Sequence, residues 1–193
     1  MHHLPECQLI LNKLKTELSP NLFYHTIHHT LDVYHCAASI AKDEGIADSD
    51  LKLLLVAAIY HDAGYLIQNK DHEQLSCEIA RQYLPQFHYT KEDIDHICSI
   101  IMATKIPQNP KSHLEEIICD ADLNYLGRTD FFILGENLYK EMLAFGSIKN
   151  KEEWNKVQVD FMQKHHYFTP TAVRQNNPQK EKNLAIVQSK INH

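Results

Sequence analysis

The spacing of apolar residues constrains the fold most, because they recur every three or four positions in nearly every segment of the chain. Glycine is scarce, with 5 residues in 193, and no segment shows the sustained apolar–polar alternation that indicates a β-strand. The N-terminal segment shows the helical pattern clearly. Its apolar positions on one helix face are Cys7, Ile10, Leu11, Leu14 and Leu18. The sequence therefore predicts an all-α protein.

Breaks in this pattern divide the chain into eight predicted helices and a C-terminal tail. Gly45, Gly64 and Gly127 follow the ends of three of them, where glycine is a common stop signal. Thr90 and Asp93 form a capping-box pattern that starts another. The predicted helices cover about residues 6–18, 26–44, 50–63, 71–84, 90–105, 112–126, 129–144 and 152–165.

Charge and cysteine content limit the class of protein. The 19 Lys and Arg residues against 25 Asp and Glu give a net charge of −6, whereas a duplex-DNA-binding protein needs clustered basic residues. The five cysteines are odd in number and far apart, which argues against a disulfide framework or a cysteine-rich zinc site. The longest apolar run, residues 53–60, is too short to span a membrane, and the N-terminus lacks a secretory-signal pattern. We therefore expect a cytoplasmic protein that binds neither duplex nucleic acid nor membranes.

The pair His61–Asp62 is the first candidate for chemistry. It ends a strongly apolar predicted helix, so it should lie near the core, where a histidine and a carboxylate must pair or bind a ligand. Taken alone, a local salt bridge or a contact with the helix dipole is the simpler explanation.

Two other predicted helices carry groups of the same kind. His29 is in register with the apolar face of the second helix, whereas His28 and His35 align with its polar face. Asp122 lies at the margin of the apolar face of the sixth helix. Asp120 lies farther from that face, where it would cap or orient a neighbouring group. A buried carboxylate needs a partner, so Asp122 joins His29 as a candidate ligand.

These groups together form a candidate metal site. Three helices each direct a ligating group inward, and the set is His29, His61, Asp62 and Asp122. A set of two imidazoles and two carboxylates is typical of a site for Mn²⁺, Fe²⁺, Zn²⁺ or Mg²⁺, and less typical of a structural zinc centre. Such a set also leaves positions open for water and substrate.

These motifs, in this order, resemble those of the HD-domain superfamily of predicted metal-dependent phosphohydrolases. The matching segments are 24–29 (YHTIHH), 61–65 (HDAGY) and 120–123 (DADL), and the resemblance covers about residues 20–130. It implies an HD-domain-like helical bundle and hydrolysis of a phosphomonoester or phosphodiester, often of a nucleotide. It also implies that the metal ligands are His29, His61, Asp62 and Asp122.

Several features depart from particular branches of that superfamily. The Gly-Tyr-Pro signature of cyclic-dinucleotide phosphodiesterases is missing downstream, and Thr26 replaces the asparagine of the common Tyr-His-Asn opening. Thr104 stands near the place where some members carry another histidine. The chain is most similar to small bacterial members whose substrates the resemblance does not imply.

Three residues are predicted to act in catalysis. Asp62 would be a metal ligand and an acceptor of the proton of the attacking water. The resemblance to the HD superfamily implies that His72 and Glu73 contact water, phosphate or a second metal. There they would orient the water or protonate the leaving oxygen. The alternative is an ordinary first helical turn, in which acidic residues favour the helix dipole.

Lys70, Lys105 and Arg128 are the candidate phosphate contacts, because each follows or ends a helix near a ligand-bearing element. Charges at such positions are otherwise solvated and favour the C-terminal dipole. His96 aligns with the polar side of its helix and is predicted to be at the surface or half-buried. The remaining histidines lack spacing partners and are predicted at the surface: His2, His3, His88, His113, His165, His166 and His193.

The sequence thus predicts a metal-dependent hydrolase of a phosphate ester, with a nucleotide or another small phosphorylated metabolite as substrate and Mn, Fe, Mg or Zn as the divalent metal. Two alternatives remain open. One is a non-catalytic nucleotide-binding HD module. The other is an HD-fold di-iron oxygenase, in which His72 and His96 would serve a second metal.

The expected organisation has three parts. Residues 1–19 form a helix packed on the bundle, residues 20–130 form the metal-binding core, and residues 131–193 complete the same domain. The apolar stripe of helix 129–144 fits a packed helix or the contact of a homodimer. The polar segment from about residue 174 to 182 is predicted to be a loop before a short last helix, residues 182–190.

Overall fold

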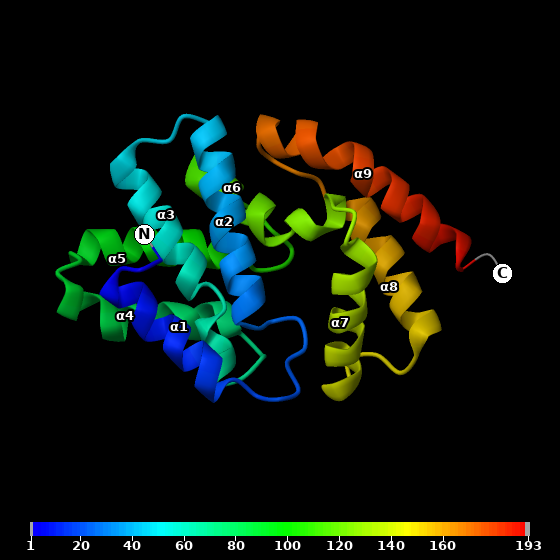
Figure 1. The fold of residues 1–193 in the computed structure, drawn as a ribbon, viewed down its shortest axis with the longest axis horizontal. Helices are drawn as coiled ribbons and strands as arrows, with labels where there is room; N and C mark the ends of the chain where they lie inside the picture. Colours follow the sequence, from blue (N-terminus) through cyan, green and yellow to red (C-terminus); the bar gives the residue numbers. More distant parts are fainter. Residues whose placement is uncertain (1, 192–193) are drawn as a thin grey trace.

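The computed structural model describes residues 2–191, and over this range it consists of nine α-helices and three short 3₁₀ helices, with no β-strand. The predicted all-α class is confirmed (Figure 1). The α-helices are α1 (Pro5–Glu17), α2 (Ile27–Asp43), α3 (Asp48–Tyr60), α4 (His72–Tyr83), α5 (Lys91–Ala103), α6 (His113–Asp122), α7 (Phe131–Ala144), α8 (Lys151–Lys164) and α9 (Pro170–Ser189). The 3₁₀ helices are η1 (Ala63–Leu66), η2 (Leu84–Phe87) and η3 (Asn124–Gly127).

Helix α3 lies at the centre of a bundle formed by α1 to α6 (Figure 1). It packs on α1, α2 and α5, and its residues 54–60 are all buried. A fully buried aliphatic side chain contributes about 1.5–3 kcal/mol, so this run makes α3 the core of the bundle. The chain leaves α3 at His61, which places the His61–Asp62 pair inside the protein. No helix in the described part of the chain is both long and apolar enough to cross a membrane.

Helices α7, α8 and α9 lie beside the bundle and form a second, smaller apolar cluster with η3 (Figure 1). The buried members of this cluster are Tyr24, Tyr125, Leu126, Phe131, Met162 and Val187. Because Tyr24 precedes α2 and Tyr125 follows α6, the cluster lies beside two of the predicted ligand motifs.

The prediction of a loop at residues 174–182 is wrong, because α9 runs without interruption from Pro170 to Ser189. Thr169 caps its first turn by accepting a hydrogen bond from the amide of Ala172. Two buried polar side chains tie this part of α9 to backbone carbonyls elsewhere. The Lys180 ammonium, within the polar segment, donates to the His165 carbonyl oxygen. Just after the segment, the side-chain amide of Asn183 donates to the carbonyl oxygens of Leu126 and Arg128, both at 2.9 Å. Hydropathy gives no sign of such a buried polar face.

His165 also departs from its prediction as a surface residue. Its ring stacks on Phe161 and meets Tyr167 edge-on, and within the described chain neither ring nitrogen has a hydrogen-bond partner or solvent contact. The Lys180 ammonium of α9 donates to the His165 carbonyl, so α9 covers this site. His28 and His35 are exposed as predicted. His193 lies outside the described residues.

Acid should destabilise the fold through His165. Burial, and then the nearby Lys180 charge, lower the pKa of this imidazole from 6.5 to about 3. Below pH 6.5 this imidazole is therefore protonated in the unfolded chain but stays neutral in the folded chain. The stability that is present above pH 6.5 is lost as the pH falls. Between pH 7 and pH 5 this coupling costs about 2 kcal/mol.

Urea unfolding of the wild type and of His165→Phe at pH 7 and pH 5 measures this effect. The variant keeps a ring of similar size but cannot take up the proton, so its free energy of unfolding should fall by about 2 kcal/mol less over this range. Equal pH dependence in the two proteins would show that His165 is free to ionise in the folded state.

Candidate metal centre

Three of the predicted ligands meet where three helices end or begin. His29 comes from the first turns of α2, His61 follows α3, and Asp122 is the last residue of α6. One ligating atom from each lies within 4.8 Å of the others. His29 Nε2 is 3.1 Å from Asp122 Oδ1, and His61 Nε2 is 3.6 Å from the same oxygen.

Asp62 brings the fourth predicted group into the same place. Its Oδ2 atom lies 3.2 Å from His61 Nε2 and 3.4 Å from His29 Nε2. Two imidazole nitrogens and two carboxylate oxygens therefore converge, although 93 residues separate His29 from Asp122. The structure brings all four residues together, and their binding of a metal stays a prediction.

Two atoms in this cluster lack the partners that buried polar atoms require. Within residues 2–191, His61 Nε2 and Asp62 Oδ2 are buried and have no hydrogen bond of acceptable geometry. His61 Nδ1 lies 2.8 Å from the carbonyl oxygen of Ala58, which can only accept. Nδ1 therefore carries a proton, and Nε2 is the ring nitrogen that faces the carboxylates and is left for a metal. A cation between these atoms would satisfy both of them, so the residues present fit a divalent metal.

The electrostatics of the cluster favour ionised carboxylates. Burial opposes the charge on Asp62 and Asp122, but their histidine neighbours hold the pKa of both carboxyl groups well below the usual range. The same carboxylates overcome the effect of burial on His61 and raise its pKa well above 6.5. Both carboxylates are therefore in the form that binds a metal at neutral pH.

A second layer of contacts holds the His61–Asp62 turn against α4. The hydroxyl of Ser76, fully buried on α4, donates to the His61 carbonyl oxygen at 2.6 Å and accepts from the Gly64 amide at 2.8 Å. Gly64 itself touches the backbone of His72, so η1 and the start of α4 lie in direct contact. Ser76 was not among the predicted residues, because a serine on a mostly apolar helix face gives no distinctive sequence signal.

Asp120 does not point into the cluster. Its two carboxylate oxygens accept hydrogen bonds from the amides of Phe168 and Thr169 and from the Thr169 hydroxyl, all at 2.8 Å. It therefore fixes the residues that precede α9 and acts as the orienting group that its register suggested.

The first turn of α4 adds two more polar groups beside the cluster. His72 Nε2 lies 3.4 Å from Asp62 Oδ1 and 3.6 Å from Glu73 Oε1, and Glu73 is the more deeply buried of the two. His72 Nδ1 is 3.1 Å from the carbonyl oxygen of Asn69. Burial lowers the pKa of His72, but its contacts with Asp62 more than offset this and raise it above the ordinary value. Asp62 thus turns one oxygen toward the cluster and the other toward His72.

The sequence reasoning missed the contact between His25 and Glu141. The Glu141 carboxylate of α7 bonds to the His25 ring and accepts from the amides of Tyr24 and His25, at 2.8 and 3.1 Å. The His25 ring stacks on Tyr65, which also stacks on His72. A signal was present, because Glu141 is a buried charge in register with the apolar stripe of α7.

The three candidate phosphate contacts lie at the periphery. Lys70 is exposed, the Lys105 ammonium pairs with Asp71 at the surface, and Arg128 pairs with Asp32 and Asp130. The contact of these residues with a phosphate stays a prediction. His96 is half-buried on α5, as predicted.

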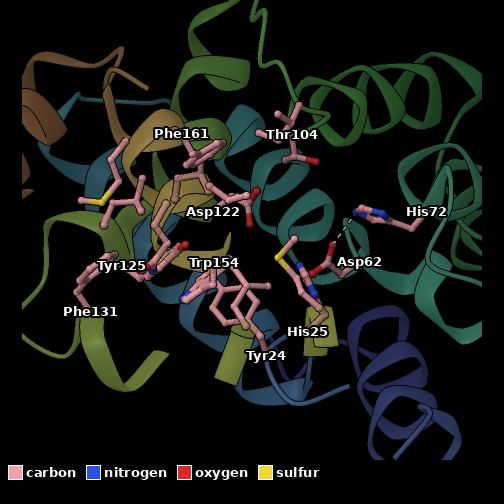
Figure 2. A pocket seen from close by; sticks show the side chains of 18 of the residues that line it. Tyr24, His25, Asp62, His72, Thr104, Asp122, Tyr125, Phe131, Trp154 and Phe161 are labelled. Atoms are coloured by element: carbon pink, nitrogen blue, oxygen red, sulfur yellow. Dashed lines mark ion pairs between the residues drawn. The ribbon is translucent and has the colours of Figure 1, made fainter. Parts of the chain in front are cut away.

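A cavity of about 310 Å³ opens from the cluster (Figure 2). Asp62, Asp122 and His72 line one end of it, and Figure 2 shows Asp62 and His72 facing each other there. The other end is apolar and is walled by side chains of η3, α7 and α8. The largest of these are Tyr125, Leu126, Phe131, Leu138, Met142, Trp154, Phe161 and Met162.

Comparison with known families agrees with this geometry. The family described as HD domain matches residues 26–123, which contain all four predicted ligands. The chain belongs to the HD domain family. The HD domain thus spans α2 to α6, whereas α7 to α9 and the apolar end of the cavity lie outside the matched segment. A search of curated proteins finds no match.

Solved structures of similar fold include three bacterial proteins. A predicted HD superfamily hydrolase from an uncultured Thermotogales bacterium has a TM-score of 0.62 and 21% identity, covering 100% of this chain and 95% of its own. Bacillus subtilis YpgQ, solved in complex with ADP, has a TM-score of 0.64 and 18% identity, and the match covers 95% of this chain and 94% of YpgQ. A Lactobacillus plantarum protein has a TM-score of 0.65 and 18% identity, and the match covers 100% of this chain and 96% of that protein. These likenesses show that the whole fold, including the C-terminal helices, occurs in other solved proteins.

Proposed function

We propose that this HD protein is a divalent-metal-dependent hydrolase of a small phosphate ester. The observation that carries the proposal is the group of two imidazoles and two carboxylates at one end of a cavity, in which two buried ligand atoms lack hydrogen-bond partners. Buried ionised groups without partners are costly, which supports a ligand-binding role over a purely structural one. The ADP bound to YpgQ supports a small phosphorylated ligand.

His29, His61, Asp62 and Asp122 would hold the metal. A divalent ion at this place polarises a phosphoryl oxygen and lowers the pKa of a bound water. The apolar cavity walls exclude bulk water, which strengthens the interaction of these charges with a phosphate.

Asp62, His72 and Glu73 would move the protons. The Asp62 oxygen that faces His72 would take a proton from the attacking water, and His72 Nε2, 3.4 Å away, would pass one to the leaving oxygen. Water adds to phosphorus, the bond from phosphorus to the ester oxygen breaks, and the alcohol leaves with the proton. Glu73 keeps the His72 ring in place from 3.6 Å.

The test combines metal content with turnover in protein purified without an affinity tag. Metal-free protein should be inactive toward a panel of phosphate esters, and Mn²⁺, Fe²⁺, Zn²⁺ or Mg²⁺ should restore release of inorganic phosphate with about one metal per chain. In the same assay His72→Gln should keep the metal and lose about 100-fold in kcat, because proton transfer contributes about that factor.

Other outcomes of this assay separate the alternatives. Two irons per chain with oxygen consumption would favour the di-iron oxygenase. Nucleotide-induced thermal stabilisation without turnover would favour a non-catalytic module. Equal turnover with and without metal would contradict the proposal.

A further inference from the structure

The two ends of the cavity differ in chemistry, and the difference bears on the substrate. The histidines and carboxylates that line it all lie near the metal-ligand cluster: His25, Asp62, His72, Glu73 and Asp122. Toward α7 and α8 the walls are almost entirely hydrocarbon and aromatic, and Figure 2 shows Trp154, Tyr125 and Phe131 on that side. A ligand that fills the cavity must therefore have one strongly polar end and one apolar end.

The polar end offers positive charge for one phosphoryl group at most. Asp62 and Asp122 balance a divalent cation, and Glu73 adds a further negative charge. Across the described residues, no lysine or arginine lines this cavity. Beyond the metal, the basic groups in this lining are the imidazoles of His72 and His25, and the His25 ring already bonds to Glu141.

Two of the candidate phosphate contacts, Lys105 and Arg128, already form ion pairs with carboxylates. The Lys105 ammonium lies 3.1 Å from Asp71 Oδ1 at the surface. Arg128 lines a neighbouring cavity and is held between the carboxylates of Asp32 and Asp130, so its charge is already compensated. A diphosphate or triphosphate chain placed in the apolar part would lose its hydration without gaining a cation, which is unfavourable.

The apolar end is suited to a flat group. Trp154 is almost fully buried and Phe161 forms the adjacent wall, so two aromatic rings border the space. Aromatic side chains contact planar groups over a large area and favour stacked or edge-on arrangements. The Gln158 side chain supplies the polar contact in this part. The volume, about 310 Å³, lies at the lower limit of ligand pockets and holds one ring system beside a phosphate.

We propose that the substrate is a phosphomonoester of an aromatic or similarly flat apolar alcohol. In contrast to YpgQ, which was solved with ADP, this site would discriminate against di- and triphosphates. This rests on the proposed function, because the phosphoryl group is taken to bind at the metal cluster. It narrows that function to one class of ester and assigns substrate selection to α7 and α8, which lie outside the segment matched by the HD family.

Trp154 gives a direct readout of binding, because it is the single tryptophan of the chain and it lines the cavity. With Mg²⁺ supplied, titration with the non-hydrolysable benzylphosphonate should change Trp154 fluorescence, and its affinity should exceed that of methylphosphonate by about tenfold. Phe161→Ala should reduce this ratio toward one. Phe145→Ala is the matched control, since Phe145 lies past the end of α7, away from the cavity, and should leave the ratio unchanged.

Turnover is measured separately, so that the two proposals can fail independently. The kcat/KM for phenyl phosphate should exceed that for glycerol phosphate, and that for adenosine monophosphate should exceed that for the triphosphate, each by about tenfold. If no ester is hydrolysed but the benzylphosphonate ratio holds, the hydrolase function is wrong and the cavity preference stands. Equal affinities for the two phosphonates, or a higher kcat/KM for the triphosphate, would overturn the substrate proposal and leave the hydrolase function intact.

Discussion

Asp122→Asn is expected to remove the bound metal and to lower kcat/KM for any phosphate ester by at least about 1,000-fold. The substitution keeps the shape of the side chain but takes away one of the two negative charges that face the cation. Losing the metal removes at least about 4 kcal/mol of transition-state stabilisation, and each 1.36 kcal/mol is a factor of ten. The helical bundle should stay folded, because the ion pairs of the Asp122 carboxylate in the described part of the chain are with the predicted ligands His29 and His61. Elemental mass spectrometry measures the loss of the metal, and the far-ultraviolet circular dichroism spectrum shows whether the helices are retained.

Asp120→Asn provides a matched control, because the same change is made two residues earlier on the same helix. The Asp120 oxygens accept three hydrogen bonds, and an asparagine would turn its amide nitrogen toward at least one of those donors. We expect a loss of about 1–3 kcal/mol in unfolding free energy with metal content retained. The reverse outcome, metal lost in Asp120→Asn and kept in Asp122→Asn, would mean that the cluster was assigned to the wrong carboxylate.

The ligand set could be predicted from the sequence because its members lie on helices with clear apolar faces. His29 is in register with Val33, and Asp122 follows Ile118 by four residues, so periodicity alone places both side chains toward the core. The end of an apolar helix does the same for His61. In each case local helix geometry decides the direction of the side chain.

Contacts between distant elements could not be predicted in this way. The ion pair of His25 with Glu141 joins residues 116 positions apart, and Asn183 reaches backbone carbonyls 55 and 57 positions away. These polar groups are buried by helices whose packing depends on the whole fold, so the composition of residues 174–182 predicts a loop although the segment is helical. The same applies to the cavity, which forms only when α7 and α8 lie against the end of the bundle.

Gly64→Ala is expected to destabilise the protein by about 3 kcal/mol and to displace His72. A Cβ atom at this position would lie 2.0 Å from the His72 carbonyl oxygen and within 3 Å of two other backbone atoms of His72. These are main-chain atoms, so the strain cannot be relieved by a side-chain rotation, and overpacking of this kind costs about 1–3 kcal/mol. Moving η1 away from α4 would also weaken the bond from the Gly64 amide to Ser76, a further loss of about 1 kcal/mol. Urea unfolding measures the change in stability.

Gly135→Ala separates this steric effect from the general effect of replacing a glycine. Gly135 lies inside α7, and the nearest atom to an added Cβ is the side-chain nitrogen of Gln158, which can turn away. Alanine is favoured over glycine in a helix by about 1 kcal/mol, so this variant should be as stable as the wild type or slightly more so. Because Gly64 joins the HD motif to the helix that carries His72, its variant should also lose turnover even where it stays folded, whereas Gly135→Ala should keep its metal and its kcat. A Gly64→Ala protein with unchanged stability and kcat would show that η1 and α4 are not held as closely as the structure places them.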